Sequence, residues 1–167
     1  MAGSLEEFNA LPAEAAEREL LACNAAPRFA REVAAARPYP SVAALADAAG
    51  RVAAGLGWDE VGAALAAHPR IGQRASGNSA EAASSRREQA AVDGAAEEVK
   101  QALADGNRAY EERFGHVFLI RAAGRGPAEM LAELTRRRHN DETTERAETT
   151  AQLAEITRLR VERLVSG

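Results

Sequence analysis

Apolar residues recur in this chain at the three- and four-residue spacing of α-helices, and signals for β-strands are scarce. Alanine, the strongest helix former, is abundant, whereas aromatic residues make up only 4% of the 167 residues. One β-like apolar run, HVFLIRAAG at 116–124, has no second run to pair with. We therefore predict an all-α fold, with a buried extended or short helical segment over this run.

Capping residues and breakers divide the chain into helices. Ser4 can cap a first helix, with its hydroxyl reaching Glu7 in a capping box, and Ser41 can cap another. Gly94 and the Asp-Gly-Asn at 105–107 are expected to bend or divide the longest helical pattern. The helical patterns cover residues 5–11, 12–24, 26–40 (ended by Pro38), 42–56, 58–68, 80–115, 126–140 and 141–165.

The length indicates one domain, residues 1–167, which is large enough to bury a core. We find no internal repeat, linker or low-complexity tail, so we predict a single compact, bundle-like domain of several helices. The net charge of -4, from 21 basic and 25 acidic residues, argues against a nucleic-acid binder.

The single cysteine, Cys23, cannot form an intrachain disulfide and is expected to be a small buried hydrophobe. No run approaches the roughly 20 apolar residues of a membrane span. The first residues, MAGSLEEF, lack the pattern of a signal peptide. These observations favour a cytoplasmic protein with no membrane partner.

His68 lies in AAHPRIGQ, residues 66–73, where a helical run meets a proline and then a glycine. At the C-terminal end of a helix, the dipole favours the protonated imidazole. The simplest interpretation is an ordinary helix stop. Gly72 and the polar loop that follows favour a functional interpretation, because they leave the imidazole near a solvent-facing surface.

Two further stretches carry chemistry. Ser85, Glu88 and Gln89 stand at i, i+3 and i+4, so a helix would place them on one face. The alternative is a solvated polar face. RFGHVFLIRAAGRG, residues 113–126, is an apolar segment flanked by glycines, which suits either a pocket wall or plain core. His116 within it is expected to be structural.

Arginines are concentrated in the last third of the chain. Arg136, Arg137 and Arg138 are consecutive and cannot all face one way, so most of them are expected to be solvated. Arg160 lies beside an apolar stripe, where a guanidinium can bind a carboxylate in a bidentate manner. HNDE at 139–142 lacks a second histidine at helical spacing, so we expect no metal site.

Taken together, five motifs resemble the 2-oxo-4-hydroxy-4-carboxy-5-ureidoimidazoline (OHCU) decarboxylase family: HPRIG, S-x-x-E-Q, NRAYEERFGHVFLIRAAGR, R-x-x-N-D-x-x-x-E and EI-x-x-L-R-V. The resemblance spans about residues 1–165. It implies an all-α carboxy-lyase, a homodimer without cofactor or metal. The implied reaction is decarboxylation of a small anionic substrate to (S)-allantoin, the last enzymatic step of urate breakdown.

The resemblance also implies residue roles. His68 and Glu88 match the catalytic residues, and the implied substrate-binding residues are Pro69, Ser85, Gln89, Phe118, Leu119, Ile120 and Arg160. Because the match passes through loops of variable length, Arg158 or Arg163 remains an alternative to Arg160. His139 stands where many relatives have a small residue.

Two other functions are compatible with a helical scaffold. The first is a lyase or hydrolase for another small ureide, because fold does not fix substrate. The second is a non-catalytic interaction module, which would require a large exposed apolar patch.

Overall fold

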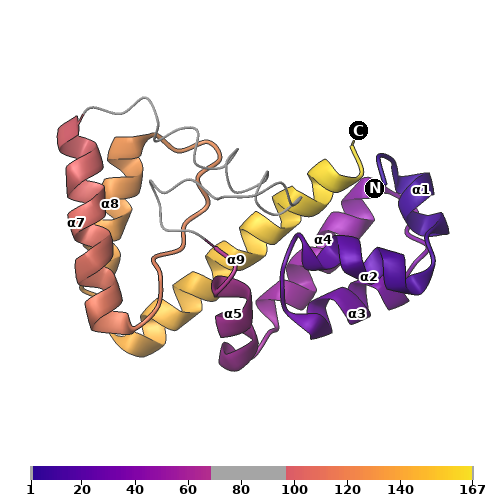
Figure 1. Ribbon diagram of the computed structural model, residues 1–167, viewed down its shortest axis with the longest axis horizontal. Coiled ribbons are helices and arrows are strands. Elements are labelled where there is room, and N and C mark those ends of the chain that lie inside the picture. Colours follow the sequence, from indigo (N-terminus) through magenta and orange to yellow (C-terminus); the bar gives the residue numbers. More distant parts are fainter. Residues whose placement is uncertain (1, 69–96, 167) are drawn as a thin grey trace. The chain divides into compact units, whose positions relative to one another are not determined.

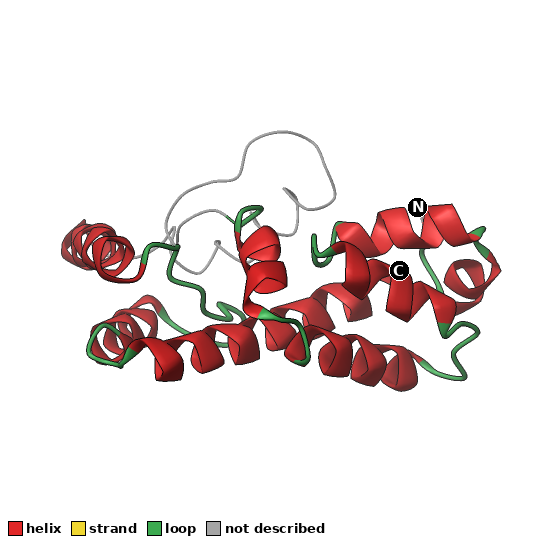
Figure 2. Ribbon diagram, turned by 90° about the horizontal axis from the view of Figure 1, so that it is seen from below, coloured by secondary structure: helices red, strands yellow, loops and turns green. Residues whose placement is uncertain are grey.

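The computed structural model describes residues 2–68 and 97–166, and within these ranges all the regular secondary structure is helical (Figures 1 and 2). An isolated bridge between Ser4 and Ser166 is the only β-type pairing there. The predicted all-α class is confirmed. The helices are α1 (Leu5–Ala10), α2 (Ala13–Leu21), α3 (Pro27–Ala35), α4 (Val42–Ala54), α5 (Trp58–Leu65), α7 (Glu97–Phe114), α8 (Pro127–Arg137) and α9 (Glu142–Leu164).

Two predicted helix caps are present. The Ser4 hydroxyl accepts a hydrogen bond from the Glu7 amide at 3.2 Å, and the Ser41 hydroxyl accepts one from the Ala44 amide at 3.0 Å. The Glu7 carboxylate accepts from the Gly3 amide at 2.7 Å, so it closes the first cap one residue earlier than a standard capping box. Each bond satisfies an N–H group that the first helical turn leaves without a partner.

The prediction of a break at 105–107 is wrong, because α7 continues through these residues. Gly106 is buried, and a Cβ atom built on it would lie 2.6 Å from Cδ2 of Leu134 in α8. The glycine therefore permits a close approach of two helices rather than a turn. Gly94 lies outside the described residues.

The chain divides into two compact units. The first consists of Met1–Ala64 with Leu153–Gly167, and in it α2 packs against α3 and α3 against α4. The boundary with the second unit falls inside α9, which supplies residues to both. The prediction of one domain over 1–167 stays a prediction. The fully buried core side chains of the first unit include Phe8, Leu20, Phe29, Leu45, Val61, Leu153 and Val161.

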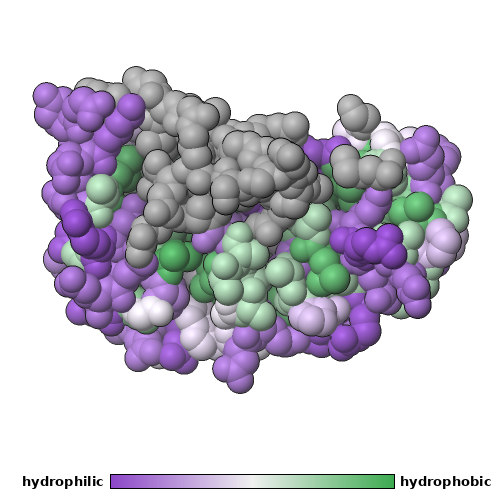
Figure 3. All heavy atoms as spheres, in the orientation of Figure 1, coloured by the Kyte–Doolittle hydropathy of each residue, from purple (hydrophilic) through white to green (hydrophobic). Residues whose placement is uncertain are grey.

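The second unit consists of Leu65–Gln152, and its core lies where α7 packs against α8. The 115–126 segment runs from the C-terminal end of α7 back to the start of α8 (Figure 1). The outer face of α7 is hydrophilic, as the left edge of Figure 3 shows. The core cluster consists of Leu103, Tyr110, Phe118, Ile120, Ala122, Met130 and Leu134.

Two further sequence-based expectations concern burial and membranes. Cys23 is buried, as expected. Among the helices of the described ranges, none combines the length and the apolar character needed to cross a lipid bilayer.

Candidate active site

His68 follows the C-terminus of α5. The helix ends at Leu65, three residues before the predicted end, and Ala66 and Ala67 form a turn. The His68 amide donates to the Leu65 carbonyl at 2.9 Å, which extends the last turn of the helix. The side chain is half-buried. His68 therefore follows directly on a helix terminus, as the sequence indicates.

The 117–122 segment is irregular and largely buried. Phe118, Leu119 and Ile120 are at most 5% exposed, and the segment forms no strand. The sequence predicts a buried segment, either extended or short helical, without a strand partner; its burial and the lack of a strand are confirmed, and the segment is not helical. His116, just before it, stacks edge-on against the ring of Tyr110, with 5.5 Å between ring centroids. This contact fits the structural role expected for His116.

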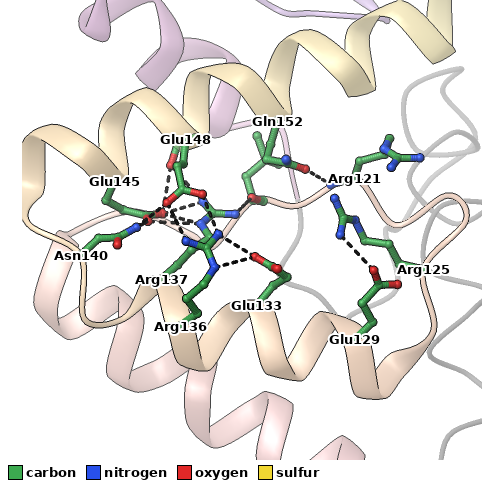
Figure 4. Close-up of polar contacts among 12 residues, drawn as sticks. Arg121, Arg125, Glu129, Glu133, Arg136, Arg137, Asn140, Glu145, Glu148 and Gln152 are labelled. Carbon is green, nitrogen blue, oxygen red and sulfur yellow. Dashed lines mark hydrogen bonds and ion pairs between the residues drawn. The ribbon is translucent and has the colours of Figure 1, made fainter.

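Side chains from α8 and α9 hold the backbone of this segment. Arg137 in α8 donates from Nη1 to the Leu119 carbonyl at 2.7 Å. Gln152 in α9 accepts a hydrogen bond from the Arg121 amide at 2.8 Å (Figure 4). A buried backbone without helix or sheet partners needs such side-chain partners. The two helices thus fix the position of the segment.

Arg137 belongs to a buried ion pair with Glu145, and sequence reasoning did not find it. The side chains are 2% and 0% exposed, and Nη2 lies 2.5 Å from Oε2. The sequence predicts that most of the three arginines are solvated; Arg136 is half-exposed and Arg138 is intermediate in exposure, whereas Arg137 is the buried member. The motif R-x-x-N-D-x-x-x-E was the available signal, because it contains both Arg137 and Glu145.

The four residues that define the motif, Arg137, Asn140, Asp141 and Glu145, are all engaged in the corner between α8 and α9. Asn140 donates to the Glu145 carboxylate at 3.1 Å. Asp141 accepts from the Thr144 amide at 2.7 Å and so caps α9, and this backbone hydrogen bond lowers the pKa of the Asp141 carboxyl. The motif therefore builds a corner that holds an ion pair.

Tyr110 of α7 completes the buried cluster. Its hydroxyl donates to the Glu145 carboxylate. Burial, and after it the hydrogen bond to Glu145, raises the pKa of Tyr110 well above its ordinary value of 10. The phenol is therefore protonated at neutral pH and acts as a donor, which helps to satisfy the buried carboxylate.

A second, outer ion-pair group surrounds this cluster. Arg136 binds Glu133 and Glu148, each at 2.7 Å (Figure 4). The pKa of the Glu148 carboxyl is lowered, first by the hydrogen bonds from Arg136 and to a smaller extent by the one from Asn140. Partial burial acts in the opposite direction but is outweighed. This outer group is partly exposed. In the described part of the chain, its ion pairs lie within α8 or join α8 to α9 and do not reach the 117–122 segment.

The three candidate arginines of α9 differ in their surroundings. Arg160 is 3% exposed. Arg158 has a side chain that is 42% exposed and lies 2.5 Å from Asp47. Arg163 is half-buried. Burial thus distinguishes Arg160 from the alternatives within the first unit.

Four predicted site residues, Pro69, Ser85, Glu88 and Gln89, lie outside the described residues. The structure places His68 and the 118–120 stretch in the second unit and Arg160 in the first. In residues 2–68 and 97–166, no group of three His, Cys, Asp or Glu side chains is arranged to hold a metal ion.

Comparisons with known proteins identify the family. The family model described as OHCU decarboxylase matches residues 9–162. A crystal structure of an OHCU decarboxylase in the presence of (S)-allantoin is 27% identical, with a TM-score of 0.76 over 89% of this chain and 98% of that one. No curated protein sequence matches at a significant level.

A crystal structure of an (S)-allantoin synthase is also similar, with a TM-score of 0.70 over 97% of this chain. At 16% identity this likeness concerns the fold, and the chain spans about half of that protein's length. The fold and the family match define an all-α carboxy-lyase. The chain belongs to the OHCU decarboxylase family.

Proposed function

We propose that this protein decarboxylates OHCU to (S)-allantoin without a cofactor, acting as a homodimer in urate breakdown. The observation that carries the proposal is the family match over residues 9–162. The similar OHCU decarboxylase crystallised in the presence of (S)-allantoin supports the assignment of the product.

The substrate's own structure explains why no cofactor is needed. One ring carbon holds both a carboxylate and a hydroxyl, and it adjoins a C=N bond. When the C–CO2 bond breaks, its electron pair moves toward the C=N, which acts as the electron sink. The ring nitrogen of the former C=N takes up a proton, which gives an enol. Loss of the hydroxyl proton and protonation of the ureido-bearing carbon then give allantoin, and the protonated face sets the configuration. The enzyme must position groups, move protons and stabilise charge.

His68 is the proposed acid–base residue, because an imidazole commonly moves protons near neutral pH and the backbone of His68 is fixed at the end of α5. Glu88 is proposed to orient the imidazole or polarise the substrate hydroxyl. Arg160 is proposed to bind the anionic substrate, without over-stabilising the carboxylate that leaves. Its low exposure supports this choice over Arg158, which pairs with Asp47.

The remaining proposed binding groups surround the ring. Phe118, Leu119 and Ile120 are proposed to line the pocket, as the family match implies. Phe118 and Ile120 also pack into the core cluster of the second unit, and Arg137 holds the Leu119 carbonyl, so the segment has a fixed backbone. The other binding residues of the proposal are Pro69, Ser85 and Gln89.

The alternative of a non-catalytic interaction module lacks support. In the part of the chain that the structure describes, Leu21 is the only large hydrophobic side chain that is exposed. A docking surface of the kind this module needs would require several such side chains together. The alternative of another small ureide as substrate is tested by the assay below.

The decisive experiment compares the wild type with His68→Asn on freshly generated OHCU, following the optical activity of the allantoin formed. Wild type should yield the (S)-enantiomer, and the variant should lose about 10²- to 10⁴-fold in rate. Circular dichroism should show an unchanged helical content. A variant that keeps most of its kcat would refute the role of His68, and an inactive wild type would refute the substrate.

A further inference from the structure

We propose that Arg137 is a positioning residue for the reaction: its buried pair with Glu145 holds the Leu119 carbonyl, and through it the pocket wall. The inference rests on the proposed function, because the pocket role of Phe118, Leu119 and Ile120 is itself a proposal. Arg137 need not contact the substrate for this role.

The geometry of Arg137 leaves its guanidinium one orientation. Nε lies 3.0 Å from Oε2 of Glu145, and Nη2 lies 2.5 Å from the same oxygen. Nη2 also donates to the Thr149 hydroxyl at 3.3 Å, while Nη1 donates to the Leu119 carbonyl at 2.7 Å. The guanidinium plane lies over Phe118, 4.5 Å from the ring centroid. Arg137 therefore contacts both the backbone and a side chain of the proposed wall.

The carboxylate that orients Arg137 is itself fixed from three sides. Tyr110 of α7, Asn140 of the corner and Thr149 of α9 each donate to Glu145. A fully satisfied buried network has little freedom to rearrange. The position of Leu119 is thus determined jointly by α7, α8 and α9.

A second anchor lies two residues further along the segment. Gln152 of α9 accepts a hydrogen bond from the Arg121 amide at 2.8 Å (Figure 4). The segment is therefore held at two points of its backbone, the Leu119 carbonyl and the Arg121 amide. Ile120 lies between the two anchored residues, so its backbone position follows from theirs.

Stability alone does not account for this arrangement. Replacing a buried ion pair with apolar residues of similar volume is often neutral or stabilising. An apolar pair in place of Arg137 and Glu145 would fill the same space, but it would leave the Leu119 carbonyl without its donor. This difference separates a positioning role from a merely structural one.

The test compares the double variant Arg137→Met/Glu145→Met with Arg136→Met. Arg136 is the matched control, because it is the neighbouring arginine of α8 and binds two carboxylates without holding the segment. We expect the double variant to unfold cooperatively but at a lower temperature than wild type, because the buried Leu119 carbonyl and Tyr110 hydroxyl lose their partners. Below that temperature, kcat/KM for OHCU should be lowered about 10²-fold, the scale of a misplaced binding group. The dissociation constant for (S)-allantoin should rise, and Arg136→Met should stay within about twofold of wild type in both readouts.

Amide hydrogen exchange over residues 117–122 gives a readout independent of activity. Exchange should be faster in the double variant and unchanged in Arg136→Met. Gln152→Leu removes the second anchor at a half-buried position of α9. This variant should show faster exchange of the Arg121 amide and a higher KM for OHCU. It therefore tests the inference even if the double variant does not fold.

Wild-type exchange rates in either anchor variant, or wild-type kinetics in a folded double variant, would overturn the inference while leaving the proposed function intact. A wild-type enzyme inactive on OHCU, together with faster exchange in the variants, would overturn the role in this reaction and the proposed function, and leave only the anchoring of the segment.

Discussion

Gly106→Ala should destabilise the protein although Gly106 lies inside a helix. Alanine is favoured over glycine in a helix interior by about 1 kcal/mol. At Gly106, however, the new Cβ would lie 2.6 Å from Cδ2 and 3.2 Å from Cγ of Leu134, and Leu134 is fully buried. Overpacking of a filled core costs about 1–3 kcal/mol. The net effect should be a loss of about 0–2 kcal/mol in the free energy of unfolding.

Gly62→Ala is the matched control. Gly62 lies inside α5, and a Cβ there meets nothing within 4 Å. Only the higher helix propensity of alanine then acts, so the free energy of unfolding of this variant should rise by about 0.5–1 kcal/mol. Equilibrium urea unfolding of both variants, followed by circular dichroism, measures the two free energies against wild type. The two changes in the free energy of unfolding should have opposite signs: Gly106→Ala should lower it and Gly62→Ala should raise it.

A second-site change identifies the cause. Leu134→Val removes the Cδ atoms that the new methyl group would meet, so it should cost less in the Gly106→Ala background than in wild type. Equal costs in both backgrounds, or a Gly106→Ala variant as stabilised as Gly62→Ala, would refute the close-packing argument.

Three further predictions concern charge and chemistry. The hydrogen bonds from Arg28 hold the pKa of Glu60 at about 2, below its ordinary 4.5, so this pair should stabilise the fold above about pH 4.5 and lose its effect as pH falls toward 2. The Tm difference between wild type and Arg28→Met should therefore shrink over that interval. Dialysis against a chelator should leave the activity unchanged because the substrate holds its own electron sink, and restoration of lost activity by a divalent ion would contradict this. Arg160→Ala should chiefly raise KM, and Glu88→Gln should chiefly lower kcat; the effects of the two changes should not be additive in the double variant. Normal kinetics in Arg160→Ala, with a KM defect in Arg158→Ala or Arg163→Ala, would place the binding arginine elsewhere on α9.

The helices were predictable because their signals are local. Periodicity, the serine caps at Ser4 and Ser41 and the positions of prolines depend on a few neighbouring residues, and the structure reproduces them. Errors appear where a distant element decides. Gly106 resembles a break until α8 is known to pack against it. Arg137 resembles a solvated arginine, because arginine is rarely buried unless it is paired, and its partner lies in the next helix.

The candidate site was predictable only in part for the same reason. The position of His68 at a helix end follows from the local sequence, and so does the burial of the Phe118 segment. The anchors of that segment could not be predicted, since Arg137 and Gln152 reach it from helices that begin later in the chain. The predicted grouping of Ser85, Glu88 and Gln89 on one face stays a prediction.

The corner between α8 and α9 also bears on the order in which the second unit assembles. Arg137 and Glu145 are eight residues apart, whereas the Leu119 carbonyl is 18 residues from Arg137 and Tyr110 is 35 from Glu145. Short loops close at a lower entropic cost than long ones, so the corner can form early and capture the other two segments afterwards. Tyr110→Phe should then accelerate unfolding and leave the folding rate nearly unchanged, in stopped-flow measurements against urea. A variant that instead folds more slowly would place the docking of α7 before the kinetic barrier.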